Sequence, residues 1–222
     1  MIYPDKIIKS NRRTMSLSIS REGAIVVRAP NRIKEQDINK FVTQKQDWLI
    51  SKLAEIQLNQ NKFSDIIEYQ KFLLFGLKYE IALADIKRIE TNGHTILVPK
   101  TTEQEKILPS IIHFYKKKAK EIISKRVAYI KSIMHIEPKA IKITNSRGRW
   151  GACNSNKNIS FNWRIIMLSP ACIDYVIVHE LCHLVEMNHS KRFWTLVETF
   201  LPNYNDLRAQ KKEYGFLLDM YR

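Results

Sequence analysis

The segment His179-Glu180-Leu181-Cys182-His183 constrains this 222-residue chain more than any other feature. On a helix, four residues advance about 6 Å and rotate about 40° past one full turn, so the two imidazoles would project from one face. Neutral histidine nitrogen is a good zinc ligand, and a catalytic zinc takes three protein ligands and a water. Glu180 would lie beside the first ligand, where its carboxylate can take a proton from that water. The segment therefore predicts a helix that carries a zinc site together with its base.

The residues around this motif are typical of a buried helix. Ser169 is a suitable N-cap, and Pro170 suits the first helical position, where its missing N–H costs nothing. Asn188 tolerates the left-handed conformation that is common after a helix, so we expect the helix to end there. An apolar body is supplied by Val176, Ile177, Leu181, Leu184 and Val185.

Three residues are candidates for the third metal ligand. His189 follows the motif by six residues and would return to the metal from the turn after the helix. Glu198 would bring a carboxylate from the next helix, which is the other arrangement found in this kind of site. Glu186 shares the face of His179 but lies two helical turns away. We favour His189, then Glu198, then Glu186.

The composition is that of a globular chain with an uneven charge. Hydrophobic residues make up 45% of the sequence, enough for a sizeable core. The net charge is +15: residues 1–105 hold 17 basic and 13 acidic side chains, whereas residues 106–222 hold 20 and nine. A basic surface attracts anionic partners such as nucleotides, nucleic acid or acidic peptides. A generally positive surface without a specific partner explains the charge equally well.

The sequence predicts a cytoplasmic protein that does not enter a membrane. No apolar stretch is as long as a membrane span, and the first residues lack an apolar signal region. The three cysteines form no C-x-x-C pair, which argues against a disulfide framework. We expect Cys182 to be a small buried residue on the side of the helix away from the ligands.

Alternating patterns and turn signals predict an α+β fold with a β-rich N-terminal half. Strands are expected at 15–19 and 24–28, and hairpins around Gly76 and around Asn92-Gly93. One helix is expected between residues 38 and 56. The polar stretch 101–105 is the best linker, which divides the chain into a β-rich N-terminal region, 1–105, and a hydrolase domain, 106–222.

The second region predicts a minimal zincin-like order of helix, sheet, motif helix and further helices. A long helix is expected from 108 to 134, and two short strands at 141–144 and 159–161. The motif helix follows, and then helices from about Phe193 and Tyr204. In such a fold a sheet edge can align an extended substrate across the metal.

The segment between those two strands is a second candidate constellation. Arg147 and Arg149 offer forked donors that suit phosphate or carboxylate, and the glycines beside Trp150 allow close backbone approach. Cys153 is expected to border the metal or contact substrate. We take these four residues as candidate substrate-binding residues. A tight turn with Trp150 filling the core is an equally good interpretation.

These motifs together resemble one known family, the YgjP-like metal-dependent hydrolases, which are also labelled SprT-like or zincin-type metallopeptidases. The resemblance covers nearly the whole chain. One departure is Ala152, where the family more usually has serine, so a substrate contact made by that hydroxyl would be missing. The matching residues are Arg12-Arg13, Met15-Ser16-Leu17, Arg28-Ala29-Pro30, Trp48, Phe75-Gly76, Tyr79, Arg147, Trp150-Gly151, Cys153, Asn162-Trp163, Pro170, Tyr175 to His183, Asn188-His189-Ser190 and Phe193-Trp194.

The resemblance implies one catalytic Zn²⁺ held by His179, His183 and His189, with Glu180 as the activating base. It leaves the substrate open between a peptide and a nucleoside triphosphate, because the family is also associated with UTP pyrophosphohydrolysis. Both reactions use a metal-bound water, a base and positive charge beside the developing oxyanion. A phosphate substrate would draw on cations such as Arg147, Arg149, Lys157 and Arg164.

A third possibility is a SprT-like protease that acts on DNA, for which the basic stretch Lys116 to Lys120 is the support. An ordinary solvated helix face is the simpler explanation of that stretch. Tyr175, one turn before His179, is expected to pack in the core, although its hydroxyl could also donate to an oxyanion. Oligomeric state is not encoded in any of these patterns.

Overall fold

The computed structural model describes residues 2–20, 23–62, 71–146 and 148–221. The chain divides into two compact units, residues 1–67 and 68–222, and each is described by itself. None of the helices in these ranges has both the length and the apolar character needed to cross a membrane. The α+β class expected from the sequence is confirmed, with strands dominating the first half and helices the second.

The first unit is a three-stranded sheet followed by two helices. The central strand β3 pairs parallel with β1 and antiparallel with β2. Its apolar core joins alternate residues of β3 to the helices through Ile25, Val27, Ala29, Ile38, Val42 and Leu49. The elements are β1 (Lys6–Ser10), β2 (Ser16–Ile19), β3 (Ile25–Pro30), α1 (Glu35–Thr43) and α2 (Gln46–Lys62).

The sequence predicted one helix between residues 38 and 56, and the described residues there form two, α1 and α2. The break lies at Gln44 and Lys45, where the N–H of Lys45 donates to the carbonyl of Val42 at 3.0 Å. That bond spans three residues instead of four, so it tightens the last turn and ends α1. The apolar periodicity continues across the break, which is why the pattern read as one helix.

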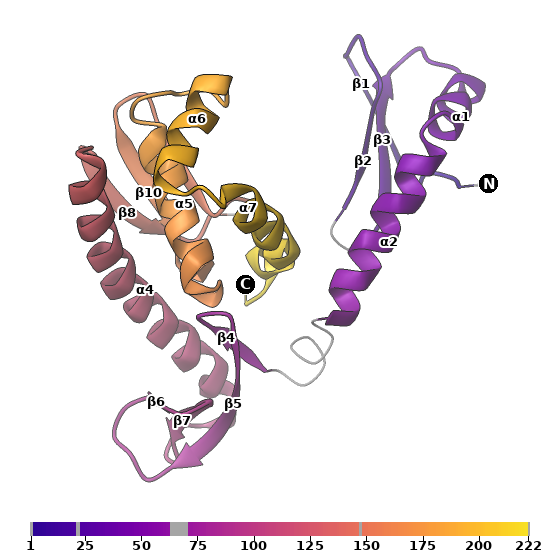
Figure 1. Cartoon of the computed structure of the whole chain (residues 1–222). Helices are drawn as coiled ribbons and strands as arrows, with labels where there is room; N and C mark the ends of the chain where they lie inside the picture. Colours follow the sequence, from indigo (N-terminus) through magenta and orange to yellow (C-terminus); the bar gives the residue numbers. More distant parts are fainter. Residues whose placement is uncertain (1, 21–22, 63–70, 147, 222) are drawn as a thin grey trace. The chain divides into compact units, whose positions relative to one another are not determined.

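The second unit contains two sheets, a long helix and the motif helix (Figure 1). Its four-stranded sheet has the order β4-β5-β7-β6, and the expected hairpins β4–β5 and β6–β7 are both present. These elements are β4 (Phe72–Leu74), β5 (Leu77–Ala84), β6 (Glu90–Asn92), β7 (Thr95–Pro99) and α4 (Gln104–Met134).

The smaller sheet has the order β8-β10-β9, with β10 parallel to β8 and antiparallel to β9. The sequence predicted the outer strand β8 and the central strand β10, but treated β9 as part of a loop. The remaining elements are β8 (Ala140–Thr144), β9 (Gly151–Cys153), β10 (Asn158–Asn162), η1 (Trp163–Met167), α5 (Pro170–Cys182), α6 (Lys191–Phe200), α7 (Tyr204–Glu213) and η2 (Tyr214–Asp219).

The division between the units differs from the one expected at residue 105. The β4–β5 turn docks on the chain that enters α5, because the N–H groups of Phe75 and Gly76 donate to the carbonyls of Ile166 and Met167 at 2.8 and 3.1 Å. Gly76 is left-handed, and a Cβ there would lie 3.1 Å from the Cα of Ser169. The β4–β7 sheet therefore belongs with the motif helix, and residues 101–105 are only a short connection within that unit.

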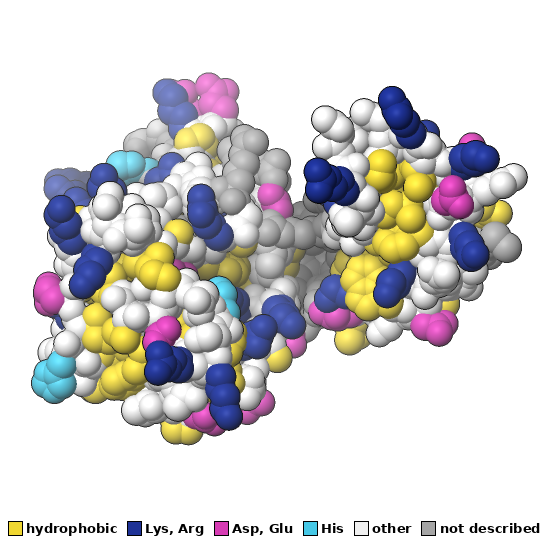
Figure 2. Space-filling view, turned by 90° about the horizontal axis from the view of Figure 1, so that it is seen from above, with side chains coloured by type: hydrophobic (Ala, Val, Ile, Leu, Met, Phe, Trp, Pro, Cys, Tyr) yellow, Lys and Arg dark blue, Asp and Glu magenta, His cyan; other side chains and the backbone are white. Residues whose placement is uncertain are grey.

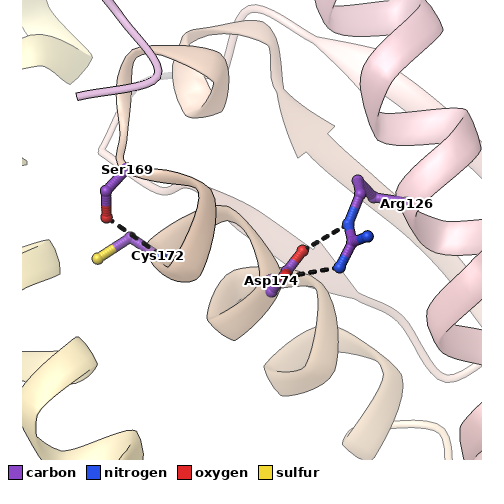
Figure 3. Close-up of polar contacts among 4 residues, drawn as sticks. All are labelled: Arg126, Ser169, Cys172 and Asp174. Carbon is purple, nitrogen blue, oxygen red and sulfur yellow. Dashed lines mark hydrogen bonds and ion pairs between the residues drawn. The ribbon is translucent and has the colours of Figure 1, made fainter. Parts of the chain in front are cut away.

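Helix α5 is fastened at its start and along its side (Figure 3). The Ser169 hydroxyl accepts from the N–H of Cys172 at 3.4 Å, as expected of an N-cap. Arg126 of α4 donates twice to the Asp174 carboxylate, with distances of 2.8 and 2.6 Å. Such a forked pair fixes direction as well as distance, so α4 sets the orientation of α5.

Arg164 ties the end of the chain to the loop before β9. Its side chain is 2% exposed, and its Nε and Nη2 donate to the carbonyl of Met220 at 2.9 and 2.6 Å. Nη2 also donates to the carbonyl of Tyr221 at 3.0 Å, and Nη1 donates to Asn145 Oδ1. The guanidinium lies 4.4 Å from the centre of the Trp163 ring. A buried charge with this many partners holds its neighbours in place.

We predict that Arg164→Met lowers the free energy of unfolding by about 3 kcal/mol, because buried carbonyls would lose their donors. The matched control is Arg88→Met, since Arg88 is exposed. Urea denaturation followed by tryptophan fluorescence measures both. A loss below about 1 kcal/mol for Arg164→Met would contradict this assignment.

Candidate metal centre

Three imidazoles converge at the end of α5. His179 lies in its last turn, His183 is its C-cap, and His189 returns from the following loop. Their nearest ring nitrogens all lie within 4.8 Å of one another, and the Nε2 atoms of His179 and His189 are 3.1 Å apart. Two nitrogens bound to one tetrahedral zinc at about 2.05 Å would be about 3.3 Å apart. The spacing of the donors therefore fits a single ion.

The following turn and helix hold two of these rings in place. His183 Nδ1 lies 3.0 Å from the carbonyl oxygen of Glu186, which can accept its proton and leave Nε2 free for a metal. Phe193 stacks on His183 with ring centres 4.5 Å apart, and Trp194 stacks on His189 at 5.5 Å. Both aromatic residues come from the first turn of α6, so this helix clamps the site.

The motif helix ends at Cys182 rather than near Asn188 as the sequence predicted. Leu184 and Val185 donate backbone N–H groups to carbonyls only three residues earlier, at 2.9 and 3.0 Å. These tighter bonds end the α-helix and turn the chain back. The early end is what allows His189 to reach the other two imidazoles.

The two alternative ligands lie outside this group. Among the residues that the structure describes, His189 completes the cluster, whereas Glu198 is exposed on α6. Glu186 faces His183 with its backbone carbonyl. The geometry thus favours the first of the three candidates.

His179 is suited to metal binding before any metal arrives. Burial lowers its pKa to about 3, and the charges of His183 and Lys211 act in the same direction. The ring is therefore neutral at physiological pH, which is the form that donates a lone pair to a metal. Its Nδ1 is buried and has no hydrogen-bond partner among the described residues. Cys182, on the same helix, is fully buried, as expected of a packing residue.

Glu180 is buried against the backbone of β9. Its side chain is 6% exposed, and burial raises its pKa to about 7, while the charges of Lys211 and Arg149 act to lower it. A Cβ on Gly151 would lie 2.6 Å from Glu180 Cγ and 2.7 Å from its Oε1. Only glycine leaves room for this carboxylate, so strand β9 and the base of the motif are matched to each other.

Comparison with known proteins identifies the family. A family model described as "YgjP-like, metallopeptidase domain" matches residues 13–214, which is most of the chain. The chain belongs to this family. Membership confirms the resemblance seen in the sequence, makes the protein a hydrolase of the metallopeptidase type and implies a divalent metal. The three converging imidazoles are a donor set that fits such a metal.

One solved structure is similar to part of the chain. The metallopeptidase zymogen of Pyrococcus abyssi abylysin aligns with 20% identity over 40% of this chain and 93% of its own, with a TM-score of 0.37. A similarity this low supports no structural argument. No curated protein gave a match.

The candidate substrate-binding residues of this YgjP-like protein differ in how deeply they are buried. Arg149 is exposed, and its charge acts on Glu180. Cys153 is half-buried on β9, where burial and the Glu180 charge raise the pKa of its thiol. Trp150 is 7% exposed, which favours the interpretation that it fills the core. Arg147 lies outside the described residues.

The two other cations considered for phosphate, Lys157 and Arg164, are not among the charges that act on Glu180. Lys157 is exposed in the turn between β9 and β10. Arg164 was expected to be available and is instead buried beneath the chain end, so that prediction was wrong. Nothing local in the sequence shows that its partners are carbonyls more than fifty residues away.

Sequence reasoning missed the contribution of α7. Lys211 is half-buried, and its charge acts on both Glu180 and His179. Tyr175 was expected to pack in the core, and it is 1% exposed there, beneath the Lys211 ammonium. The spacing of the cations on α7 could be seen in the sequence. Only the packing of α7 on α5 shows that this helix lies next to the site.

We predict that His189→Ala weakens zinc binding by more than about 100-fold. Losing a metal ligand lowers the affinity more than losing a residue that hydrogen-bonds to a ligand, which lowers it by about 10- to 100-fold. Glu198→Ala is the matched control, because the two side chains lie close in the sequence but only one belongs to the cluster. Zinc affinity is measured by competition with a chromophoric chelator. The reverse order of effects would make Glu198 the ligand.

Proposed function

We propose that this protein is a zinc-dependent peptidase in which Glu180 acts as the general base. The observation that carries the proposal is the position of Glu180, buried against Gly151 and adjacent in the chain to a cluster of three imidazoles. His179, His183 and His189 would hold the ion. When bound, zinc would lower the pKa of a water and polarise the scissile carbonyl.

Glu180 is suited to moving a proton in this reaction. Burial raises the pKa of Glu180 and so makes it a better proton acceptor, whereas nearby positive charge acts in the opposite direction. The carboxylate would take the proton of the attacking water and deliver it to the leaving amine. Burial in a tightly packed position also holds the carboxylate still, which lowers the cost of alignment.

Strand β9 would align the substrate. It is one of the two outer strands of its sheet and, among the described residues, pairs only with β10, through Gly151, Ala152 and Cys153. Its other edge can accept an extended peptide as a further strand, which places the peptide backbone next to Glu180. Ala152 supplies no hydroxyl on this strand, so recognition would come from backbone bonds.

A second candidate is hydrolysis of a nucleoside triphosphate such as UTP on the same site. The charge of Arg149 beside Glu180 favours it, because phosphate oxygens need nearby cations. Lys157 and Arg164 do not add to that charge, so the phosphate clamp inferred from the sequence is weaker than expected.

An action on DNA has less support. Lysine and arginine side chains are spread over the face seen in Figure 2 and do not gather in one patch. On α4, Lys116 and Lys118 lie 6.0 and 5.3 Å from the centres of the Trp163 and Phe114 rings. Lys116, Lys117 and Lys120 are exposed, as on an ordinary solvated helix face.

The proposal is tested with Glu180→Gln. We expect this variant to bind one zinc and to cleave a mixed-sequence peptide library at least about 1,000 times more slowly than the wild type, since it removes the base and keeps the ligands. Mass spectrometry of the library measures cleavage. A nucleoside triphosphate panel is run in parallel. Cleavage of peptides at the wild-type rate would refute the role of Glu180, and turnover of triphosphates alone would favour the second candidate.

We further predict that Gly151→Ala binds zinc normally but loses at least about tenfold in kcat, because the added methyl group displaces Glu180. Gly215→Ala is the matched control, since a Cβ there meets no atom within 4 Å and Gly215 has no positive φ. Kinetics and zinc content are measured for both. Equal activity of the two variants would show that the contact does not position the base.

A further inference from the structure

Helix α7 presents the half-buried Lys211 toward the motif helix α5 and the exposed Arg208 toward α6. Arg208 and Lys211 are three residues apart, so they share one face of α7. The Lys211 ammonium lies 5.2 Å from the centre of the Tyr175 ring, and the Arg208 guanidinium lies 4.5 Å from the centre of the Trp194 ring. Each cation thus sits on an aromatic face.

Both aromatic rings in turn contact a residue of the metal cluster. The rings of Tyr175 and Trp194 each lie 5.8 Å from the ring of His179, and Trp194 also stacks on His189. Each cation is therefore separated from a metal ligand by one aromatic ring. Lys211 is also close enough to Glu180 for each charge to affect the other's pKa.

Neither cation is neutralised by an ion pair within the described part of the chain. The ion pairs of α4 and its surroundings involve other lysines and Arg126. Burial lowers the pKa of Lys211, and the negative charge of Glu180 opposes that effect at a distance. The positive charge is held beside the site without a carboxylate at salt-bridge distance.

The charge balance of the loaded site calls for an anion. With zinc bound, the site would hold a divalent cation together with Lys211, Arg208 and Arg149, against the single carboxylate of Glu180 and three neutral imidazoles. Lys211 is half-buried, whereas Arg208 and Arg149 are exposed, so solvent screens Lys211 least and the repulsion acts mainly between Lys211 and the metal. A negatively charged ligand group would relieve this repulsion.

We propose that Lys211 and Arg208 form an anion subsite that binds the terminal carboxylate of a short peptide substrate. A guanidinium matches two carboxylate oxygens, and an ammonium adds a point charge. This inference rests on the proposed peptidase function, and it makes the enzyme one that cleaves near a free C-terminus. A phosphate group presents the same chemistry to the subsite, so the test separates the two sources.

The test measures equilibrium binding to the zinc-loaded full chain by calorimetry, because binding does not depend on turnover. The ligands are an N-acetylated tripeptide with a free C-terminal carboxylate, the same tripeptide as its C-terminal amide, and inorganic phosphate. The variants are Lys211→Met and Arg208→Met, which keep an unbranched stem over each ring. Lys212→Met, at an exposed neighbouring position on α7, is the matched control.

We expect the wild type and Lys212→Met to bind the acid at least about tenfold more tightly than the amide. Lys211→Met and Arg208→Met should each reduce that ratio severalfold, and together bring it near one. Circular dichroism and zinc content confirm that each variant is folded and loaded.

Three other outcomes are informative. Equal binding of acid and amide by the wild type, or a ratio unchanged by both substitutions, overturns the subsite and leaves the peptidase proposal standing. Binding of phosphate alone, weakened by Lys211→Met, supports the subsite but shifts the substrate to a phosphate compound, against the peptidase proposal. No binding of any ligand overturns the subsite.

Discussion

Burial of helix α5 is the constraint on which the rest of this unit depends. Thirteen residues run from Pro170 to Cys182, and nine of them are buried, including the charged Glu180. A buried carboxylate is expensive unless its surroundings are arranged for it. Every packing contact of α5 therefore bears on the site: α4, α6, α7, η1 and β9 all pack against it.

The contacts at the two ends of α5 fix its position along its axis. At the start, Ser169 caps the helix, Gln210 of α7 accepts from Ser169 and Cys172, and the Gly76 turn closes over Ser169. At the other end, the tight turn after Cys182 returns the chain to the cluster. With both ends fixed, the imidazoles and the carboxylate have little freedom to move.

Aromatic rings complete the frame around the histidines. Phe193 contacts all three imidazoles, with ring centres 4.5 to 4.9 Å apart, and Trp194 contacts two of them. Apolar rings help to bury His179, and this burial lowers its pKa and keeps the ring neutral. The same rings carry the cations of α7. The same aromatic side chains thus pack against both the metal ligands and the cations of α7.

The features that depend on residues close together in the sequence could be predicted from it. The N-cap at Ser169, the glycine turns and the helix that bears His179 and His183 follow from residues close in the sequence. Positions set by distant contacts could not be predicted. Among these are the early end of α5, the pairing of β9 beside Glu180, the boundary between the units and the burial of Arg164 under the chain end.

The roles of Glu180 as base and of the three histidines as ligands are predictions from the motif. The placement of Gly151 against Glu180 gives those roles a physical basis that the motif alone did not. The cations of α7, by contrast, belong to no motif that the sequence analysis identified. Only the packing of α7 on α5 shows that they lie near the site.

The central claim is that three imidazoles hold one zinc and leave a position open for water beside Glu180. X-ray absorption at the zinc edge of the loaded protein tests it most directly. We expect three nitrogen ligands and one oxygen at about 2.0–2.1 Å, with no sulfur. A sulfur ligand at about 2.3 Å would bring Cys153 into the shell and contradict the account.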